Sequence, residues 1–190
     1  MRALIAVASK HGSTSEMGRR IAANLRHSGI EATFCLAEQV KSIQGYELVV
    51  LGSAVYANKM LPAMTALVYR WGDQLAACRT YLFCSGPLDA PVPGNVPLPP
   101  DARALMRLSG VKDSRMFGGA MALDRLRPSE RALMRIWGSK SGDYRDWAEV
   151  DAWSAQIASQ ALGQARDEAA GDGARDEAAG DGPDETPPTA

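Results

Sequence analysis

The sequence has few of the residues that build metal sites. Its 190 residues include three cysteines and two histidines. The cysteines (Cys35, Cys78 and Cys84) lack the C-x-x-C spacing of metal and redox motifs. Cys35 and Cys84 lie in apolar runs, which predicts small buried side chains. A metal centre is therefore not expected.

Long apolar runs and catalytic constellations are also missing. No stretch approaches the roughly 18 apolar residues of a membrane-spanning helix. The apolar stretch near Met1 is short and predicts a strand, not a signal peptide. The sequence shows neither a pair of acid–base carboxylates nor a nucleophilic triad, so no catalytic side chain is assigned. We expect a cytosolic protein of one domain.

Charge is unevenly distributed along the chain. Residues 165–190 contain eight carboxylates and two arginines, a net charge of −6. Because the whole chain carries −1, residues 1–164 carry about +5. The segment Ala165–Gly173 is repeated letter for letter at Ala174–Gly182, with no aromatic or branched aliphatic residue. We predict a folded domain over residues 1–164 and a disordered acidic tail over 165–190.

A turn rich in small and hydroxyl residues follows the first apolar run. The segment reads LIAVASKHGST, with Ser9, Gly12, Ser13 and Thr14 in the turn. A strand, a glycine turn and a helix N-terminus together form a cradle for an anion such as phosphate. Neither the G-x-G-x-x-G of dinucleotide folds nor the G-x-x-x-x-G-K of P-loops is present. The alternative is an ordinary turn with a serine N-cap.

Apolar runs and helical patterns alternate along the chain. Buried strands are predicted at Ala3–Ala8, Ala32–Leu36, Leu48–Gly52, Tyr81–Cys84 and Met116–Met121. Helices are predicted at Ser13–Ser28, Pro62–Leu75, Asp101–Leu108, Ser129–Trp137 and Trp147–Leu162. This alternation predicts an α/β fold: a doubly wound, five-stranded parallel sheet, order 2-1-3-4-5, with helices on both faces. Ligands of such folds bind at the carboxyl ends of the strands, beside the first strand.

Two further loops follow strands at that edge. Gly52–Ala57 combines small residues with Tyr56, which is placed to stack on a flat ring. Cys84–Leu88 offers backbone groups to the polar edge of a flavin, with Leu88 as an aliphatic cover. The alternatives are that Tyr56 packs on its neighbours and that Cys84–Leu88 is a plain turn.

Taken together, these segments resemble the flavodoxin-like FMN proteins and, more narrowly, the flavodoxin-type, menaquinone-dependent protoporphyrinogen oxidases. The resemblance covers roughly residues 2–162. It depends on Ser9–Thr14, one Thr-to-Ser change from the T-x-x-G-x-T phosphate loop, and on Val49–Lys59, Met116–Leu123 and Arg135–Ala158. It implies FMN as cofactor, with Ser9, Lys10, His11, Gly12, Ser13 and Thr14 at the phosphate. It implies Ser53, Ala54, Val55, Tyr56 and Ala57 on one side of the isoalloxazine, and Ser85, Gly86, Pro87 and Leu88 at its other side or edge.

Two other segments fit the same subfamily. Leu88–Pro100 is rich in proline and is either a lid beside the flavin or a surface connector. In the second segment, Arg125, Arg127, Arg131, Arg135 and Lys140 interleave with leucines, Met134, Ile136 and Trp137. Such a basic amphipathic helix suits an anionic membrane surface or an anionic substrate. The alternative is a helix whose apolar side faces the sheet.

The expected function is an FMN-dependent oxidoreductase in which the cofactor carries the redox chemistry. A small-molecule substrate, with protoporphyrinogen as the candidate, would supply electrons to a quinone-type or protein acceptor. Peripheral membrane contact is expected, and a nucleic-acid partner is not. The alternatives are an electron carrier that serves a protein partner and a flavodoxin-fold regulator without cofactor. A deazaflavin would satisfy the same loops, and the oligomeric state stays open.

Overall fold

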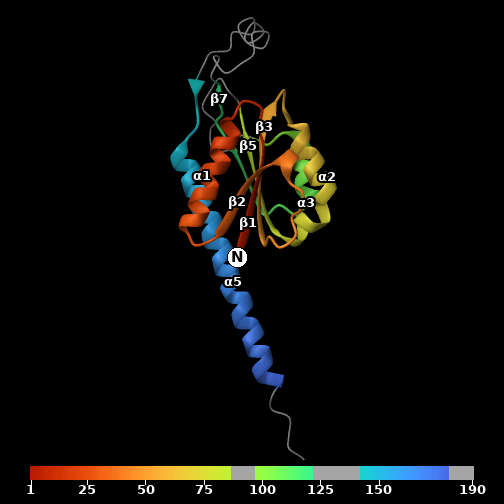
Figure 1. Ribbon diagram of the computed structural model, residues 1–190, viewed down its shortest axis with the longest axis vertical. Coiled ribbons are helices and arrows are strands. Elements are labelled where there is room, and N and C mark those ends of the chain that lie inside the picture. Colours follow the sequence, from red (N-terminus) through yellow and green to blue (C-terminus); the bar gives the residue numbers. More distant parts are fainter. Residues whose placement is uncertain (87–96, 122–141, 180–190) are drawn as a thin grey trace, which may run out of the picture.

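A parallel sheet forms the centre of the molecule. The computed structural model describes the backbone of residues 1–86, 97–121 and 142–179, and the side chains of these residues except Met121 and those after Arg166. The parallel strands are β1 (Arg2–Ala8), β2 (Glu31–Leu36), β3 (Leu48–Tyr56), β5 (Arg79–Ser85) and β6 (Asp113–Phe117), in the order β2-β1-β3-β5-β6 (Figure 1). The short β4 (Lys59–Met60) pairs antiparallel with the end of β3. The predicted order 2-1-3-4-5 of five parallel strands is therefore confirmed.

Helices cover both faces of the sheet. One face carries α1 (Ser13–His27) and α5 (Trp147–Ala179), and the other carries α2 (Pro62–Ala77) and α3 (Pro100–Ser109) (Figure 1). A 3-10 turn, η1 (Ala37–Gln39), follows β2. The helix predicted at Ser129–Trp137 lies outside the described residues. Among the described residues, no helix has both the length and the apolar character that a membrane crossing needs.

The hydrophobic core has two halves, one on each face of the sheet. In β1, Ile5 and Val7 pack with residues of α1 and α5, while Leu4 and Ala6 pack with residues of α2 and α3. Successive strand residues point to opposite faces, and a parallel sheet buries both of them. The unbroken apolar run in β1 follows from this double burial.

Trp153 of α5 lies at the centre of an aromatic cluster. It is 2% exposed, and its ring centroid lies 6.4 Å from that of Tyr81, 6.2 Å from Phe83 and 5.7 Å from Phe117. Its indole nitrogen donates a hydrogen bond to the Asp113 carboxylate at 3.0 Å. These contacts fasten α5 to β5 and to the edge strand β6.

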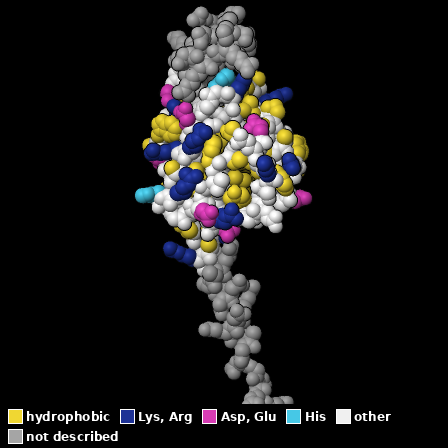
Figure 2. Space-filling view, in the orientation of Figure 1, with side chains coloured by type: hydrophobic (Ala, Val, Ile, Leu, Met, Phe, Trp, Pro, Cys, Tyr) yellow, Lys and Arg dark blue, Asp and Glu magenta, His cyan; other side chains and the backbone are white. Residues whose placement is uncertain are grey.

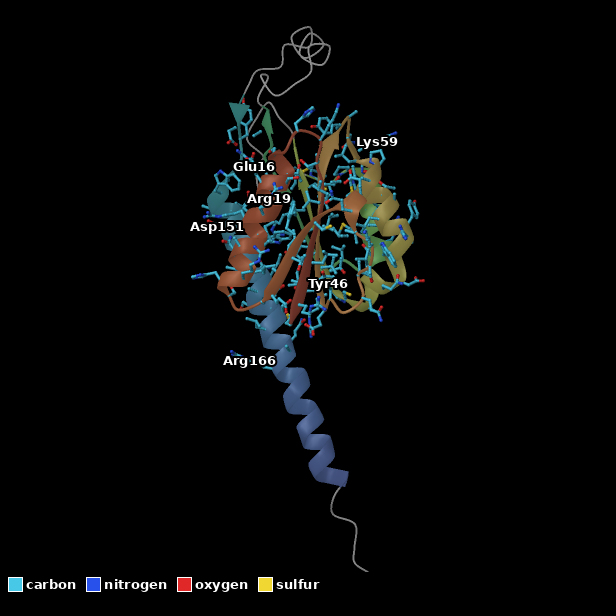
Figure 3. All side chains as sticks on the ribbon, viewed as in Figure 1. Glu16, Arg19, Tyr46, Lys59, Asp151 and Arg166 are labelled. Carbon is cyan, nitrogen blue, oxygen red and sulfur yellow. The ribbon has the colours of Figure 1, made fainter. Side chains whose placement is uncertain are left out.

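A polar clamp joins α1 to α5 where the two helices run side by side (Figure 3). The Asp151 carboxylate accepts hydrogen bonds from the Arg20 guanidinium at 2.8 and 2.7 Å and from the Asn24 amide at 2.7 Å. The same Asn24 amide donates to the Ser154 hydroxyl at 2.8 Å. Hydrogen bonds from Arg20 and Asn24 lower the pKa of Asp151 to about 2.

The clamp predicts a pH-dependent part of the stability. A carboxyl whose pKa is lower in the folded state stabilises the fold above its unfolded pKa of about 4, and this contribution is lost as the pH falls toward about 2. We expect Asp151→Asn to lower the urea midpoint slightly at pH 7, because the pair is partly exposed. At pH 2, where about half of the folded carboxyls are protonated, most of the difference between the two midpoints should be gone. A constant difference between pH 7 and pH 2 would show that the charge of Asp151 is not the cause.

The fifth strand differs from the prediction of Met116–Met121. In the structure β6 ends at Phe117, and β7 (Ala120–Met121) then pairs antiparallel with β8 (Gly142–Asp143). The backbone of Tyr144 crosses directly over Gly118, where a Cβ atom would collide with the Tyr144 carbonyl oxygen. The amide of Tyr144 also donates to the Gly119 carbonyl at 3.0 Å. The glycines therefore allow this crossing and end the parallel strand.

The end of α5 also differs from the prediction. The apolar spacing predicts an end at Leu162, but α5 continues to Ala179. Residues 165–179 continue this helix, consistent with their many Ala, Arg and Glu residues, which favour helix, and the disordered acidic tail over 165–190 stays a prediction. The last turns of α5 project away from the sheet (Figure 1). The domain boundary after residue 164 stays a prediction.

Candidate functional site

Three strand ends form one cleft at the carboxyl edge of the sheet. The cleft follows β1, β3 and β5, the strands next to one another at the middle of the sheet. Its lining residues are Ser9, Lys10, His11, Ser13, Thr14, Ala54, Val55, Tyr56, Ser85 and Ala120. Nine of these ten belong to the loops that the sequence singles out. The structure therefore brings these loops together at the sheet edge to which the fold rule on strand ends points, and their role in cofactor binding stays a prediction.

The turn after β1 presents backbone amides to this cleft. Gly12 is the N-cap of α1 with φ +94°, in the left-handed region that favours glycine. Its amide donates to the Ser9 hydroxyl at 3.2 Å, and its carbonyl accepts the first helical bond from Glu16 at 2.9 Å. The amides before Glu16 have no intrahelical acceptor, and the helix dipole favours an anion there. The N-cap is a glycine and not the serine of an ordinary capped turn.

Ser13 connects this turn to the β7–β8 hairpin. Its hydroxyl oxygen accepts a hydrogen bond from the Ala120 amide at 3.1 Å. A hydroxyl that accepts in this way keeps its proton for donation to a second partner. Ser13 can therefore hold the hairpin and still donate to an anion in the cleft. The sequence analysis did not assign Ala120 to the site, although Gly118–Gly119–Ala120 stands out as a small-residue run.

A partly exposed ion cluster fastens the same hairpin to α1. The Arg145 guanidinium donates to Glu16 at 2.5 Å and to Asp143 at 2.6 Å, and lies 4.6 Å from the ring centroid of Trp147. The Arg145 side chain is 11% exposed. The hydrogen bond from Arg145 lowers the pKa of Asp143. Sequence reasoning missed this cluster, because Glu16 and Arg145 are 129 positions apart.

Two basic side chains and one aromatic ring lie together at the mouth of the cleft. The Lys10 ammonium is 5.8 Å from the Tyr56 ring centroid. The His11 ring lies 6.2 Å from it in an edge-on arrangement of 75°. Tyr56 therefore contacts the turn after β1, and Lys10 adds a cation to the residues that line the cleft. This set of donors suits a phosphate group.

Several predicted site residues do not line the cleft. Ser53 is buried, and its hydroxyl donates to the Ala54 carbonyl at 2.9 Å and accepts from the Leu61 amide at 3.0 Å. Its side chain thus connects β3 to the start of α2. Gly12 and Gly86 shape the loops through their backbones, with φ +94° and +152°. Pro87 and Leu88 lie outside the described residues.

Ala57 belongs to the tight turn between β3 and β4. Ala57 and Asn58 have φ +47° and +60°, the pattern of a two-residue hairpin turn of type I′. A left-handed conformation at a residue with a Cβ atom costs about 1–2 kcal/mol. Strain of this kind often accompanies a functional loop, and this turn directly follows Tyr56.

The described residues show no alternative metal or thiol chemistry. No group of His, Cys, Asp and Glu side chains in the described part of the chain could hold a metal ion. Cys84 is buried in β5, and burial raises its pKa to about 12. A thiol of this kind is unreactive and serves to fill the core. Cys35 is only partly buried.

Comparison with known proteins gives the family. The family model described as a flavodoxin domain matches residues 4–147. The chain belongs to the flavodoxin domain family. A search of the curated proteins found no match. The flavodoxin domain assignment agrees with the doubly wound sheet and with the cleft at its carboxyl edge.

Solved structures show the same fold for this flavodoxin domain. A flavodoxin from the domain Archaea is 16% identical with TM-score 0.52, and the match covers 85% of this chain and 99% of that one. Rubredoxin:oxygen oxidoreductase from Desulfovibrio gigas is 13% identical with TM-score 0.54, covering 85% and 37%. A flavodoxin variant from Pseudomonas aeruginosa is 16% identical with TM-score 0.50, covering 72% and 93%. At these identities the likeness concerns the fold.

The flavodoxin domain indicates FMN as the cofactor, and the residues present fit it. The first-turn amides of α1, the Ser9 and Ser13 hydroxyls and the Lys10 cation form a donor set for its phosphate. Tyr56 offers the aromatic surface that a flat ring needs. The fold is therefore that of an FMN-binding electron-transfer domain.

Proposed function

We propose that this flavodoxin domain is an FMN-dependent oxidoreductase that takes electrons from a reduced small molecule and passes them to a quinone-type acceptor. Protoporphyrinogen and menaquinone are the proposed pair. The observation that supports this most directly is the hydrogen bond between the Ser13 hydroxyl and the Ala120 amide. It holds the β7–β8 hairpin against the cofactor cleft, and residues 122–141 begin and end at this hairpin.

The sequence of residues 122–141 suits such a substrate. Five cations alternate there with leucines, Met134, Ile136 and Trp137. Arginine pairs with carboxylates through two parallel hydrogen bonds, as the propionates of a porphyrinogen require. The apolar residues suit a lipophilic quinone or the membrane interface in which it dissolves. We therefore include peripheral membrane contact in the proposal.

The protein's part in the reaction is to bind and orient. Bound FMN supplies two-electron redox chemistry. The α1 amides with Ser9 and Ser13 hold the phosphate end, and Tyr56 limits the positions open to a flat ring. Lys10 and His11 are the ionisable residues of the phosphate turn, and their place at the cleft mouth fits charge neutralisation rather than acid–base catalysis. Oxidation of protoporphyrinogen to protoporphyrin releases six electrons and six protons, so three successive two-electron cycles would reduce three quinones to quinols for each porphyrin formed.

The second candidate is an electron carrier for a protein partner. The described residues that line the cleft include no carboxylate, and Lys10 and His11 are assigned to charge neutralisation, so none of these residues is given an acid–base role. An electron carrier does not need a general base. Residues 1–164 carry a net charge of about +5. This positive charge would repel a basic partner protein and attract an acidic one, so it argues against an electron carrier for a basic partner and agrees with one for an acidic partner.

An anaerobic turnover assay distinguishes the two candidates. The FMN-loaded protein is mixed with protoporphyrinogen and a soluble menaquinone analogue, and porphyrin fluorescence is followed. The oxidoreductase predicts porphyrin in large molar excess over FMN, with at least a tenfold lower rate in the variant Arg131→Gln, Arg135→Gln. A matched control is Lys41→Gln, far from the cleft in sequence and exposed. If protoporphyrinogen is not turned over but the bound FMN exchanges electrons rapidly with a redox protein, the result would support the electron carrier.

A further inference from the structure

An exposed hollow with both apolar and charged side chains lies between α2 and α3, away from the cofactor cleft. Tyr69 and Leu108, which are 69% and 46% exposed, are the exposed large hydrophobic side chains among the described residues. Both line one hollow between the two helices. A kink at Trp71 (φ −124°, ψ +15°) and the closely packed Gly72 next to the Leu108 carbonyl shape this surface.

The two helices also carry exposed arginines, of which Arg70 lines the hollow together with Asp73. Arg70, Arg103 and Arg107 are exposed on the two helices, and Asp73 is the exposed acidic residue there. Lys and Arg side chains lie beside hydrophobic ones over α2 (Figure 2). We call Tyr69, Arg70, Arg103, Arg107 and Leu108 the α2–α3 surface. Two such surfaces facing each other would place arginines opposite arginines, so symmetric self-pairing is disfavoured.

The chain itself contains a segment of complementary charge. Residues 165–190 carry eight carboxylates against two arginines. The body holds α5 up to Gln164, whose side-chain oxygen accepts a hydrogen bond from Arg79 at 3.0 Å. The following helical residues 165–179 extend about 22 Å at 1.5 Å per residue. Their sequence is polar all round the helix, so it offers no apolar stripe for packing on its own sheet.

We propose that residues 165–190 of one copy dock on the α2–α3 surface of a second copy, and that the exchange is reciprocal. The carboxylates would face Arg70, Arg103 and Arg107, and the alanines and prolines of the extension would cover Tyr69 and Leu108. The second copy is favoured over the same chain because the last turns of α5 lead away from their own body (Figure 1). A reciprocal exchange closes into a dimer with two identical contacts.

Salt dependence is the signature of this contact. The contact depends mainly on exposed charges, and ions screen these over about 10 Å at 0.1 M salt. The dimer should therefore form at low ionic strength and dissociate at high ionic strength. A dimer held by an apolar interface would persist or strengthen in salt.

The test is the molar mass of the full chain in solution, by light scattering after gel filtration at about 100 µM in low and high salt. The expected mass is twice 20.3 kDa in low salt and 20.3 kDa in high salt. Changing the eight tail carboxylates to Asn and Gln, or Arg103→Glu with Arg107→Glu, should weaken dimerisation at least tenfold. Lys41→Glu, an equally exposed charge reversal elsewhere, should leave it unchanged.

A charge swap completes the experiment. Combining Arg103→Glu and Arg107→Glu with lysines in place of the tail carboxylates should restore the low-salt dimer. A full chain that is monomeric in low salt overturns the proposal and indicates that the extension folds back on its own body or binds another partner. A dimer that is indifferent to the tail substitutions also overturns it and assigns the interface to another surface.

Discussion

The variant Gly12→Asp is expected to lose FMN affinity by at least a hundredfold. The new carboxylate would stand at the N-terminus of α1, where the amides converge and where the phosphate would bind. Two like charges within a few ångströms cost several kcal/mol at an effective dielectric constant near 20, and a hundredfold loss corresponds to about 2.7 kcal/mol. Titration by quenching of FMN fluorescence measures the change directly.

Gly12→Asn is the matched control for this experiment. Asparagine has nearly the shape of aspartate and tolerates the left-handed backbone of this position, but it carries no charge. We expect it to weaken FMN binding by less than tenfold. Equal losses in the two variants would assign the effect to backbone strain, and no loss in either would place the phosphate elsewhere.

The largest expected effect on stability is that of Trp153→Ala, about 3–5 kcal/mol, because it empties the centre of the aromatic cluster. Trp153→Phe keeps an aromatic ring but removes the hydrogen bond to Asp113, with an expected loss of about 1–3 kcal/mol. Urea denaturation followed by circular dichroism measures both. Comparable losses in the two variants would show that the hydrogen bond, not the packing, is decisive.

Trp147→Phe serves as the comparison within the same helix. Trp147 is only partly buried and lies against the Arg145 guanidinium. An exposed cation–π contact contributes about 0.5–1 kcal/mol, so the expected loss is small. If Trp147→Phe lowered the free energy of unfolding as much as Trp153→Ala does, the start of α5 would contribute as much to stability as its middle.

The sheet order could be predicted because local sequence encodes it. Each of the first four strands is an apolar run bounded by turn residues, and Pro62 and Gly29 mark helix ends as expected. Right-handed crossovers then leave few topologies. The place of the cleft follows from the topology alone.

The features that the sequence did not predict depend on contacts between segments that are distant along the chain. The break after Phe117 exists because Tyr144 crosses Gly118; the Gly118–Gly119 pair is a local signal for a strand end, but the crossing by a residue 26 positions later is not visible in the local sequence. The resemblance implies that Ser53 lies on one side of the isoalloxazine, but its hydroxyl accepts a hydrogen bond from the Leu61 amide, eight residues further on. The extension of α5 to Ala179 follows from helix propensity after the apolar spacing has ended.

The β7–β8 hairpin has a consequence for how such a protein diversifies. Ala120 and Arg145 are anchored to Ser13 and Glu16 on α1, so the two ends of the intervening segment stay at fixed positions. The entropy of closing a loop grows only with the logarithm of its length. Insertions, deletions or whole replacements between Met121 and Gly142 therefore leave the cofactor cleft intact. Evolution, or an engineer, can exchange the intervening segment as a cassette while the cleft is inherited unchanged.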